Sequence, residues 1–291
     1  MKSILAFCLL ASSSSSLSTA DRRILVTGAG GQTGQLAFRA LLAKPGFYPI
    51  GTTRTDDSKK ALIEGDVPEE NVVVLDITDM DSVEENMEGC DAVLICTSAK
   101  PAPTGEVDES TGRPKFGFPL GQPELVDWEG QRNLIDAAKK TNPGMHVVLC
   151  SSMGGTNPNN PLNNLGKTQA ADGKTTGGDI LKWKRKAEKY LIDSKLPYTI
   201  VHPGGLLNEP GGERELCVGV DDVIPGTSNN SLPRADVASV MIASLEDDKY
   251  RGRSFDVVSK PVGEGQVTTD FSKLVDSLGG KNCDYSLGEI A

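Results

Sequence analysis

The sequence predicts an α/β fold in which helices cover both faces of a doubly wound parallel sheet. Three observations predict it. From Arg23 onward, short apolar runs alternate with segments whose apolar residues recur at helical spacing. The apolar runs are continuous, which is typical of parallel strands buried on both faces. A glycine-rich turn joins the first run to the first helical segment.

The elements follow one another in a regular order. Each predicted strand is a run of apolar and β-branched residues, and these runs are 24–26, 48–53, 72–75, 92–96, 147–150, 199–202 and 254–258. Each predicted helix carries an apolar stripe, as Ile180, Trp183, Ala187 and Leu191 do in the segment 180–194. The other predicted helices are 35–44, 81–87, 126–140 and 237–245.

Two segments break this alternation. Residues 100–123 are rich in Pro and Gly, and residues 157–178 are rich in Asn, Gly and Thr. Both follow strand ends, where ligands bind to open α/β sheets. They are therefore either lids over one crevice or disordered surface insertions. We expect one domain over residues 21–291, with 205–235 and 259–291 forming a small C-terminal lobe for the substrate.

The composition excludes several classes of function. The chain has 291 residues and a net charge of −10, so it repels nucleic-acid backbones and no nucleic-acid partner is expected. No apolar run approaches the roughly 18 residues that span a bilayer, so no membrane partner is expected. With two His, six scattered Cys and no paired metal-ligand motif, we also expect no metal site.

The turn after the first strand has the glycine spacing of a dinucleotide-binding loop. Gly28 permits a tight turn, Gly31 lets the backbone approach a pyrophosphate, and Gly34 lets the helix pack on the sheet. Gln32 and Thr33 then open the helix, whose N-terminus faces the anion. The position between a strand and a helix supports dinucleotide binding over a simple glycine-rich turn.

The end of the second strand indicates which dinucleotide is bound. An NAD site places a carboxylate there for the ribose hydroxyls. This chain has Thr53 and Arg54 instead, and a guanidinium suits a 2′-phosphate. We therefore expect NADP(H), unless Arg54 is merely solvated. Further cofactor contacts are expected at the ends of the third and fourth strands, from Asp76, Ile77, Thr97, Ser98 and Ala99.

The first twenty residues differ from the rest. A lysine, an apolar run, a serine run and small residues before Asp21 are typical of a secretory signal peptide. Cys96 and Cys150 lie in apolar runs and indicate buried free thiols, which secreted proteins usually avoid. The segment therefore predicts entry into the secretory route, leading to secretion or to an organelle such as a plastid, and an organelle would reconcile both features. The alternative is a cytoplasmic protein.

Several motifs together resemble a known family. TGAGGQTG, LDITD, VDWEGQRNLIDAAK, SSMGGTNP, WKRKAEKYL and PRADVA occur in this order. The chain is similar to atypical short-chain dehydrogenases/reductases with an NAD(P)-binding domain, over about residues 23–274. The resemblance implies a Rossmann-type domain, a C-terminal substrate lobe and NAD(P)H-dependent oxidoreductase activity.

The resemblance also implies site residues. Family members use a Ser after the fifth strand with the Tyr and Lys of a YxxxK helix. Ser152 matches the Ser, Lys186 matches the Lys, and Lys182 stands where the Tyr is expected. The resemblance places Ser151, Pro203, Gly204 and Gly205 beside the cofactor.

The amines of Lys182 and Lys186 stack one turn apart, so one amine could be partly deprotonated. The alternative is that the basic residues of this helix other than Lys186 form a solvated face. These residues are Lys182, Lys184, Arg185 and Lys189. Ser151 and Ser152 could likewise be ordinary strand-end residues.

The missing Tyr indicates the chemistry. Hydride transfer to a ketone needs an acid for the developing alkoxide, whereas an iminium carbon or a quinone needs little such help. The sequence therefore predicts an NADPH-dependent reductase of a quinone, an iminium ion or an activated carbonyl, acting as a monomer or homodimer. The alternative is a non-catalytic NADP(H)-binding sensor or scaffold.

Overall fold

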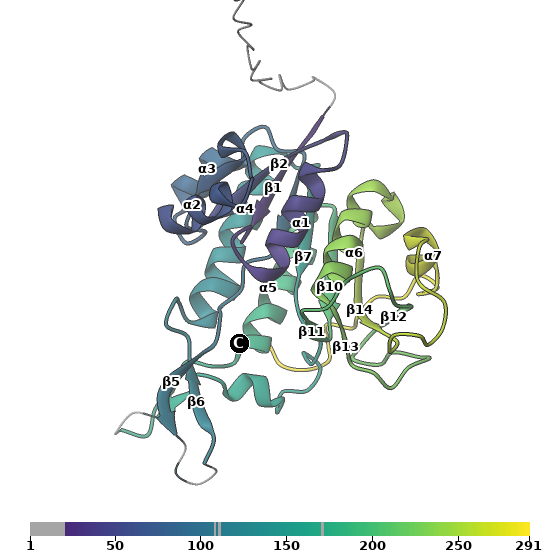
Figure 1. The fold of residues 1–291 in the computed structure, drawn as a ribbon. Helices are drawn as coiled ribbons and strands as arrows, with labels where there is room; N and C mark the ends of the chain where they lie inside the picture. The colour runs from purple at the N-terminus through teal and green to yellow at the C-terminus, as the bar shows by residue number, and fades with distance from the viewer. Residues whose placement is uncertain (1–20, 108, 110–111, 170–171) are drawn as a thin grey trace, which may run out of the picture.

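The computed structural model describes residues 21–107, 109, 112–169 and 172–291, so the predicted targeting segment 1–20 lies outside it. Its centre is an eight-stranded sheet in the order β12-β14-β10-β7-β4-β1-β2-β3 (Figure 1). All neighbouring strands are parallel except β12, which pairs antiparallel with β14. The strands are β1 (Arg22–Thr27), β2 (Phe47–Thr53), β3 (Val72–Val74), β4 (Ala92–Ile95), β7 (His146–Cys150), β10 (Tyr198–Pro203), β12 (Leu216–Gly219) and β14 (Arg253–Ser259).

The predicted doubly wound parallel sheet is confirmed. The order of strands along the chain reverses at the pair β1 and β4, which makes this pair the topological switch point. In open sheets of this kind, ligands bind in the crevice outside the carboxyl ends of the strands at that point.

Helices cover both faces of the sheet (Figure 1). One buried apolar cluster joins the sheet to α1 (Gln32–Leu42), α6 (Arg234–Glu246) and α7 (Phe271–Asp276). A second cluster, on the opposite face, joins it to α3 (Met80–Met87), α4 (Gln131–Thr141) and α5 (Ile180–Ser194). The predicted stripe of α5 is buried at Ala187 and Leu191, which anchors the helix that carries the basic motif.

Some boundaries differ from the predicted ones. The predicted helix 126–140 is divided into a π-helix η2 (Glu124–Gly130) and α4. Helix α2 (Asp56–Glu64) was not predicted because its sequence is too polar for an apolar stripe, yet Thr55 caps its N-terminus by accepting a hydrogen bond from the amide of Ser58. Short 3₁₀ turns lie at η1 (Glu69–Asn71), η3 (Pro161–Asn164) and η4 (Asp248–Tyr250).

The two irregular segments have some structure of their own. Within 100–123, β5 (Ala102–Val107) and β6 (Pro114–Gly117) form an antiparallel hairpin that projects away from the sheet (Figure 1). Within 157–178, β8 (Thr168–Gln169) and β9 (Thr175–Thr176) form a shorter one. A hairpin needs strand pairing that Pro- and Gly-rich composition does not reveal. Their role as lids stays a prediction.

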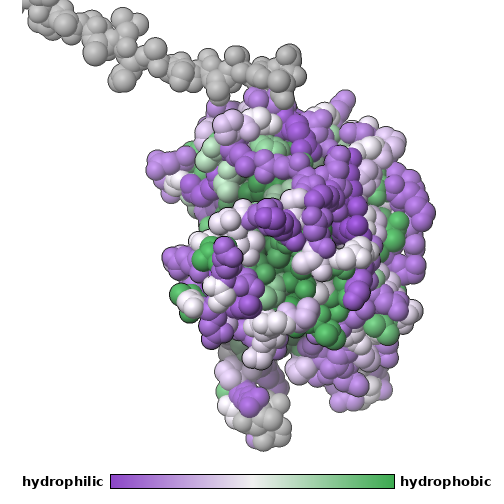
Figure 2. Space-filling model, turned by 90° about the vertical axis from the view of Figure 1, so that its right-hand side faces the viewer, coloured by the Kyte–Doolittle hydropathy of each residue, from purple (hydrophilic) through white to green (hydrophobic). Residues whose placement is uncertain are grey.

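The C-terminal segments contain β11 (Gly205–Leu207) and β13 (Ser231–Pro233), which pair in parallel, together with α7. The chain ends beside α5 (Figure 1). On the face shown in Figure 2, hydrophobic surface is surrounded by hydrophilic residues. The assignment of 205–235 and 259–291 to a substrate lobe stays a prediction.

Candidate functional site

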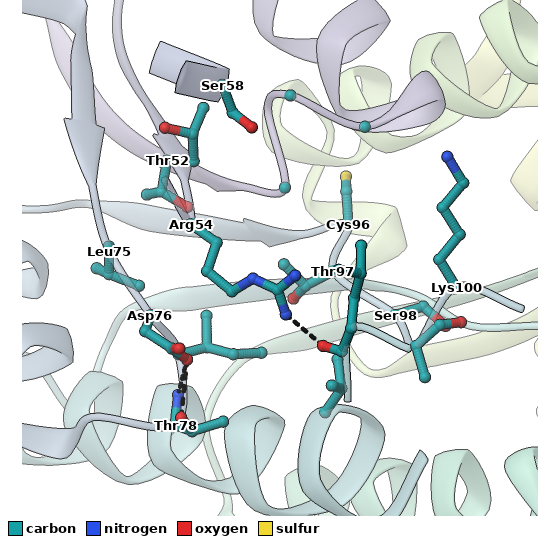
Figure 3. Close-up of a pocket in the computed structure, with 18 of the residues that line it drawn as sticks. Thr52, Arg54, Ser58, Leu75, Asp76, Thr78, Cys96, Thr97, Ser98 and Lys100 are labelled. Carbon is teal, nitrogen blue, oxygen red and sulfur yellow. Dashed lines mark hydrogen bonds between the residues drawn. The ribbon is translucent and has the colours of Figure 1, made fainter. Parts of the chain in front are cut away.

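A cleft of about 240 Å³ opens at the carboxyl ends of β1 to β4, at the switch point of the sheet (Figure 3). Nine of the residues singled out from the sequence line it. They are Gly28, Gly31, Thr53, Arg54, Asp76, Ile77, Thr97, Ser98 and Ala99. These residues come from four separate segments of the chain, so the structure brings together what the sequence only indicated segment by segment.

The glycines of the loop are required by close backbone contacts. Gly28 has a φ of +69°, and a side chain there would press against the backbone of Cys96. A Cβ on Gly34 would lie 2.2 Å from the carbonyl oxygen of Gly28, which no other residue type permits. The loop therefore brings α1 directly against the turn, as a pyrophosphate-binding loop requires.

The N-terminus of α1 is open to an anion. Gly31 occupies the N-cap position and provides no side-chain cap, and the first turn has no acidic residue. The first amides of a helix that lack partners form an anion site together with the helix dipole. Gln32 and Thr33 lie in this first turn but do not line the cleft.

Arg54 follows β2 and its guanidinium lies across the cleft. The Nη1 atom donates a hydrogen bond to the carbonyl oxygen of Leu120, from the segment after the β5–β6 hairpin (Figure 3). Ser58, in the first turn of α2, lines the same end of the cleft. A guanidinium, a hydroxyl and a helix N-terminus therefore meet where β2 ends.

Asp76 is the single acidic residue among the described residues that line the cleft. Its Oδ1 accepts hydrogen bonds from the amide of Thr78 at 2.9 Å and from the hydroxyl of Thr78 at 2.8 Å (Figure 3). The carboxylate therefore closes its own turn after β3 through Oδ1, and no described acidic residue at the end of β2 lines the cleft.

A buried ion pair supports the wall of the cleft behind Ala99. Asp127, in η2, accepts a hydrogen bond from the amide of Ala99 at 3.0 Å and pairs with the Nζ atom of Lys184 at 2.8 Å. Burial alone would lower the pKa of Lys184, but the carboxylate of Asp127 raises it, so the amine stays charged. The predicted solvated basic face is wrong for Lys184 and Arg185, which are both buried.

Ser151 and Ser152 have different surroundings. The hydroxyl of Ser151 donates to the carboxylate of Glu188 and is buried. The hydroxyl of Ser152 donates to the carbonyl oxygen of Met153 at 3.0 Å and lines a second hollow of about 10 Å³, which we call the Ser152 hollow. Glu188 continues the network to His202, whose Nε2 lies 3.1 Å away.

Lys182 and Lys186, which lie one turn apart on α5, have different partners. Lys182 pairs with Glu289 at 2.6 Å and with Asp179 at 3.6 Å, and the hydrogen bond to Glu289 raises its pKa. The expectation of a partly deprotonated amine is therefore wrong for Lys182. The Nζ of Lys186 lies 4.8 Å from the ring centre of Trp128 and 4.7 Å from that of Trp183, a cation–π contact on two sides.

The remaining predicted residues lie near β10. Pro203 ends β10, and the amides of Gly204 and Gly205 donate to Val257 and Asn230. These three residues, Ser151 and Lys186 do not line the main cleft. The structure therefore brings together the predicted residues for the adenosine and phosphate half, and leaves those for the nicotinamide half as a prediction.

Sequence reasoning missed part of the site. Ser58, Lys100 and Leu120 line the cleft, and none belongs to a strand-end motif. The available indication for Ser58 was Thr55, because a Thr followed by acidic residues such as Asp56 and Asp57 predicts the start of a helix. Leu120 reaches the cleft because the β5–β6 hairpin returns the chain to the sheet there, and no local sequence pattern predicts that position.

Known proteins are similar to this chain over most of its length. A sequence model of a family described as NAD(P)H-binding matches residues 28–248. An uncharacterised chloroplastic protein of Arabidopsis thaliana is 44% identical over 264 residues, which are 90% of this chain and 77% of that protein. Sanguinarine reductase of Eschscholzia californica is 42% identical over 275 residues, 88% of this chain and 95% of that enzyme.

Solved structures share the fold. The oxidoreductase YlbE of Lactococcus lactis superposes with a TM-score of 0.60 at 20% identity, covering 89% of this chain and 98% of that one. No helix of the described residues is long and apolar enough to cross a membrane.

Proposed function

Because the chain belongs to the NAD(P)H-binding family and is an NAD(P)H-dependent oxidoreductase, we propose that it transfers hydride from NADPH to a small electron-poor substrate. The substrate class that we propose comprises quinones, iminium ions and activated carbonyl compounds. The observation that carries the proposal is the main cleft, which is lined by the glycine loop before the open N-terminus of α1 and by Arg54.

The preference for NADPH over NADH is supported by the charges where β2 ends. Arg54 and Ser58 line the cleft there, and Asp76 is engaged with Thr78. A guanidinium binds a phosphate through charge-assisted, planar hydrogen bonds. It cannot accept hydrogen bonds from the ribose hydroxyls, as the carboxylate of an NAD site does. When bound, the cofactor supplies the hydride, and this chain supplies the binding and orientation.

The substrate class is supported by the positions of the possible proton donors. Lys182 stands at the Tyr position of the family motif, and its ammonium pairs with Glu289 and has a raised pKa. All five tyrosines lie in the described residues, and none lines either the main cleft or the Ser152 hollow. Hydride transfer to an iminium carbon yields a neutral amine and needs no such donor.

Ser152 and Lys186 are the proposed catalytic residues. Ser152 would orient the polar atom of the substrate, and Lys186 would contact the nicotinamide ribose. The two Trp rings beside Lys186 limit the positions of its amine, and this supports an orienting role over a freely solvated one. Around them, Ser151, Pro203, Gly204 and Gly205 would complete the nicotinamide end, while Gln32, Thr33 and Gly34 would complete the pyrophosphate loop.

A second candidate function is a non-catalytic NADP(H) sensor or scaffold. The observation that favours it is the size of the Ser152 hollow, which at about 10 Å³ holds one water and not an organic substrate. The reductase proposal therefore requires the loop after Ser152 or the chain end near α5 to move when substrate binds.

One experiment separates the two functions. Purified full-length chain is first tested for NADPH binding by fluorescence. NADPH oxidation is then followed with a quinone, an iminium alkaloid and a simple aldehyde. Turnover with the quinone or the iminium ion and little with the aldehyde is expected. Equal or better turnover with the aldehyde would contradict the proposed substrate class, and tight NADPH binding without turnover would favour the sensor.

We also propose import into an organelle. Several relatives are named chloroplastic proteins, including the Arabidopsis thaliana protein that is 44% identical, and the Ser-rich segment 1–20 has no acidic residue. A fluorescent protein fused behind residues 1–20 should enter plastids in a plastid-bearing cell. Secretion of the fusion, or its retention in the cytoplasm, would contradict this proposal.

A further inference from the structure

Three potential metal ligands that are far apart in the sequence meet beside the Ser152 hollow. His202 in β10 and Asp256 in β14 are register partners on adjacent parallel strands. Side chains at the same register on neighbouring strands project on the same side of a sheet. Cys283 reaches them from the C-terminal segment, because its amide donates to the carbonyl oxygen of Ser254 at 3.0 Å. All three side chains are buried.

The distances among their ligand atoms fit a small ion. The Nδ1 atom of His202 lies 3.3 Å from Oδ1 of Asp256 and 3.6 Å from Sγ of Cys283, and these two atoms lie 3.9 Å apart. A point equidistant from three atoms so spaced lies about 2.1 Å from each, and zinc–ligand bonds are about 2.0–2.3 Å long. No ligand needs to move far to bind one ion.

The surroundings of the cluster support metal binding. The Nε2 atom of His202, on the far side of the ring, lies 3.1 Å from the carboxylate of Glu188. Metal-binding histidines usually engage a carboxylate in this way, which fixes the tautomer and the ring orientation. The other carboxylate oxygen of Asp256 accepts the amide of Asp222 at 2.6 Å, so Oδ1 is left to face the cluster.

The available space selects an ion over an organic ligand. His202, Asp256 and Cys283 line the Ser152 hollow, whose volume of about 10 Å³ admits one water molecule. A set of one nitrogen, one oxygen and one sulfur ligand with room for one water is the composition of a four-coordinate zinc site. Mg²⁺ and Ca²⁺ prefer oxygen ligands in larger number.

We propose that His202, Asp256 and Cys283 bind one zinc ion, which fastens the C-terminal segment to β10 and β14. The fourth position is filled by a water in the Ser152 hollow. The same segment is held at a second place by Arg185, whose Nε donates to the carbonyl oxygen of Leu287 at 2.9 Å and whose guanidinium lies 4.6 Å from the ring centre of Tyr285. The zinc ion and Arg185 together keep this segment over the hollow.

The test uses the full-length chain with its affinity tag removed, since a histidine tag would bind zinc itself. The protein is treated with a chelator, titrated with Zn²⁺ by calorimetry and analysed for zinc after gel filtration. One zinc per chain is expected. Cys283→Ser and Asp256→Asn should weaken binding by about 100-fold or more, because loss of even an outer partner typically costs 10–100-fold.

A matched control is available in Cys217, which is as buried as Cys283 at 8% exposure but lies in β12 outside the cluster. Cys217→Ser should bind zinc as the wild type does. In the wild type and in this control, Co²⁺ should give a thiolate charge-transfer band, which Cys283→Ser should lack.

The wild type alone provides a second measurement if the Cys283 variant fails to fold. Zinc should slow alkylation of Cys283, mapped by mass spectrometry, and leave alkylation of Cys90 unchanged. The proposal is overturned by the absence of retained zinc, by wild-type zinc affinity in Cys283→Ser, or by equal protection of both thiols. The cluster would then be a hydrogen-bonded network alone.

Discussion

The Nζ atom of Lys184 lies 2.8 Å from Oδ1 of Asp127, and both side chains are buried. The pair links α5 to η2, and Asp127 in turn holds the amide of Ala99 in the wall of the main cleft. Removing one partner of a buried ion pair leaves the other charge unpaired in a medium of low polarity. This pair therefore couples the stability of the fold to the shape of the cofactor site.

Asp127→Ala is expected to lower the free energy of unfolding by about 3–5 kcal/mol, measured by urea denaturation. It should also weaken NADPH binding, because the amide of Ala99 loses its acceptor. The double variant Asp127→Asn with Lys184→Met should recover part of the loss, since no charge is then buried without a partner. A decrease in the free energy of unfolding of less than about 1 kcal/mol for Asp127→Ala would contradict the assigned role, because solvent-exposed ion pairs contribute no more than that to stability.

Arg54→Ala tests the preference for NADPH. The affinity for NADPH should fall by about tenfold or more, since hydrogen bonds to charged groups contribute about 1.5–3 kcal/mol, and the affinity for NADH should stay nearly constant. Dissociation constants from cofactor fluorescence check this. Lys60→Ala, which removes an exposed charge from α2 outside the cleft, serves as the control. Equal losses for both cofactors would rule out a 2′-phosphate role for Arg54.

Gly34→Ala tests the contact between α1 and its turn. Alanine stabilises an isolated helix relative to glycine by about 1 kcal/mol. Here its Cβ would lie 2.2 Å from the carbonyl oxygen of Gly28, so the variant should lose stability and bind NADPH more weakly. Thermal unfolding and cofactor titration measure both effects. Gln35→Ala, at the next position of α1, should change neither, and a stabilised Gly34→Ala would show that the turn can relax.

The parts of the fold that the sequence predicts are those set by local patterns. The apolar run of β1, the loop from Gly28 to Gly34 and the stripe of α5 each depend on residues close together in the chain. The Ser152 hollow does not, because Asp256 and Cys283 arrive from segments far from Ser152. Likewise, Lys184 has the sequence context of a solvated residue, and only the distant Asp127 makes its burial possible.

Ser152→Ala tests the proposed catalytic hydroxyl. Loss of the hydroxyl that orients the substrate should lower kcat by up to about 10²-fold, because a misplacement of about 1 Å can cost that much. The affinity for NADPH should change by less than about twofold because Ser152 lies outside the main cleft. Steady-state kinetics with the best quinone or iminium substrate measure kcat. Ser239→Ala, on an exposed part of α6, is the matched control. An unchanged kcat would remove Ser152 from the mechanism.

The pH dependence of stability should contain a contribution from His146. Burial lowers the pKa of His146 from 6.5 to about 4, and its Nε2 lies 2.9 Å from the hydroxyl of Thr199. The unfolded chain therefore takes up the proton first as the pH falls. The contribution of the neutral ring is fully present above pH 6.5 and is lost between there and about pH 4.

Because the pKa is lowered from 6.5 to about 4, the free energy of unfolding should fall by about 3 kcal/mol over this pH range. His146→Gln keeps a polar group near Thr199 but cannot titrate, so its free energy of unfolding should fall less steeply than that of the wild type over this range. Urea denaturation at a series of pH values measures the difference, and Lys139→Gln, an exposed change on α4, should follow the wild type. Parallel curves for wild type and His146→Gln would show that His146 becomes protonated in the folded state near its ordinary pKa.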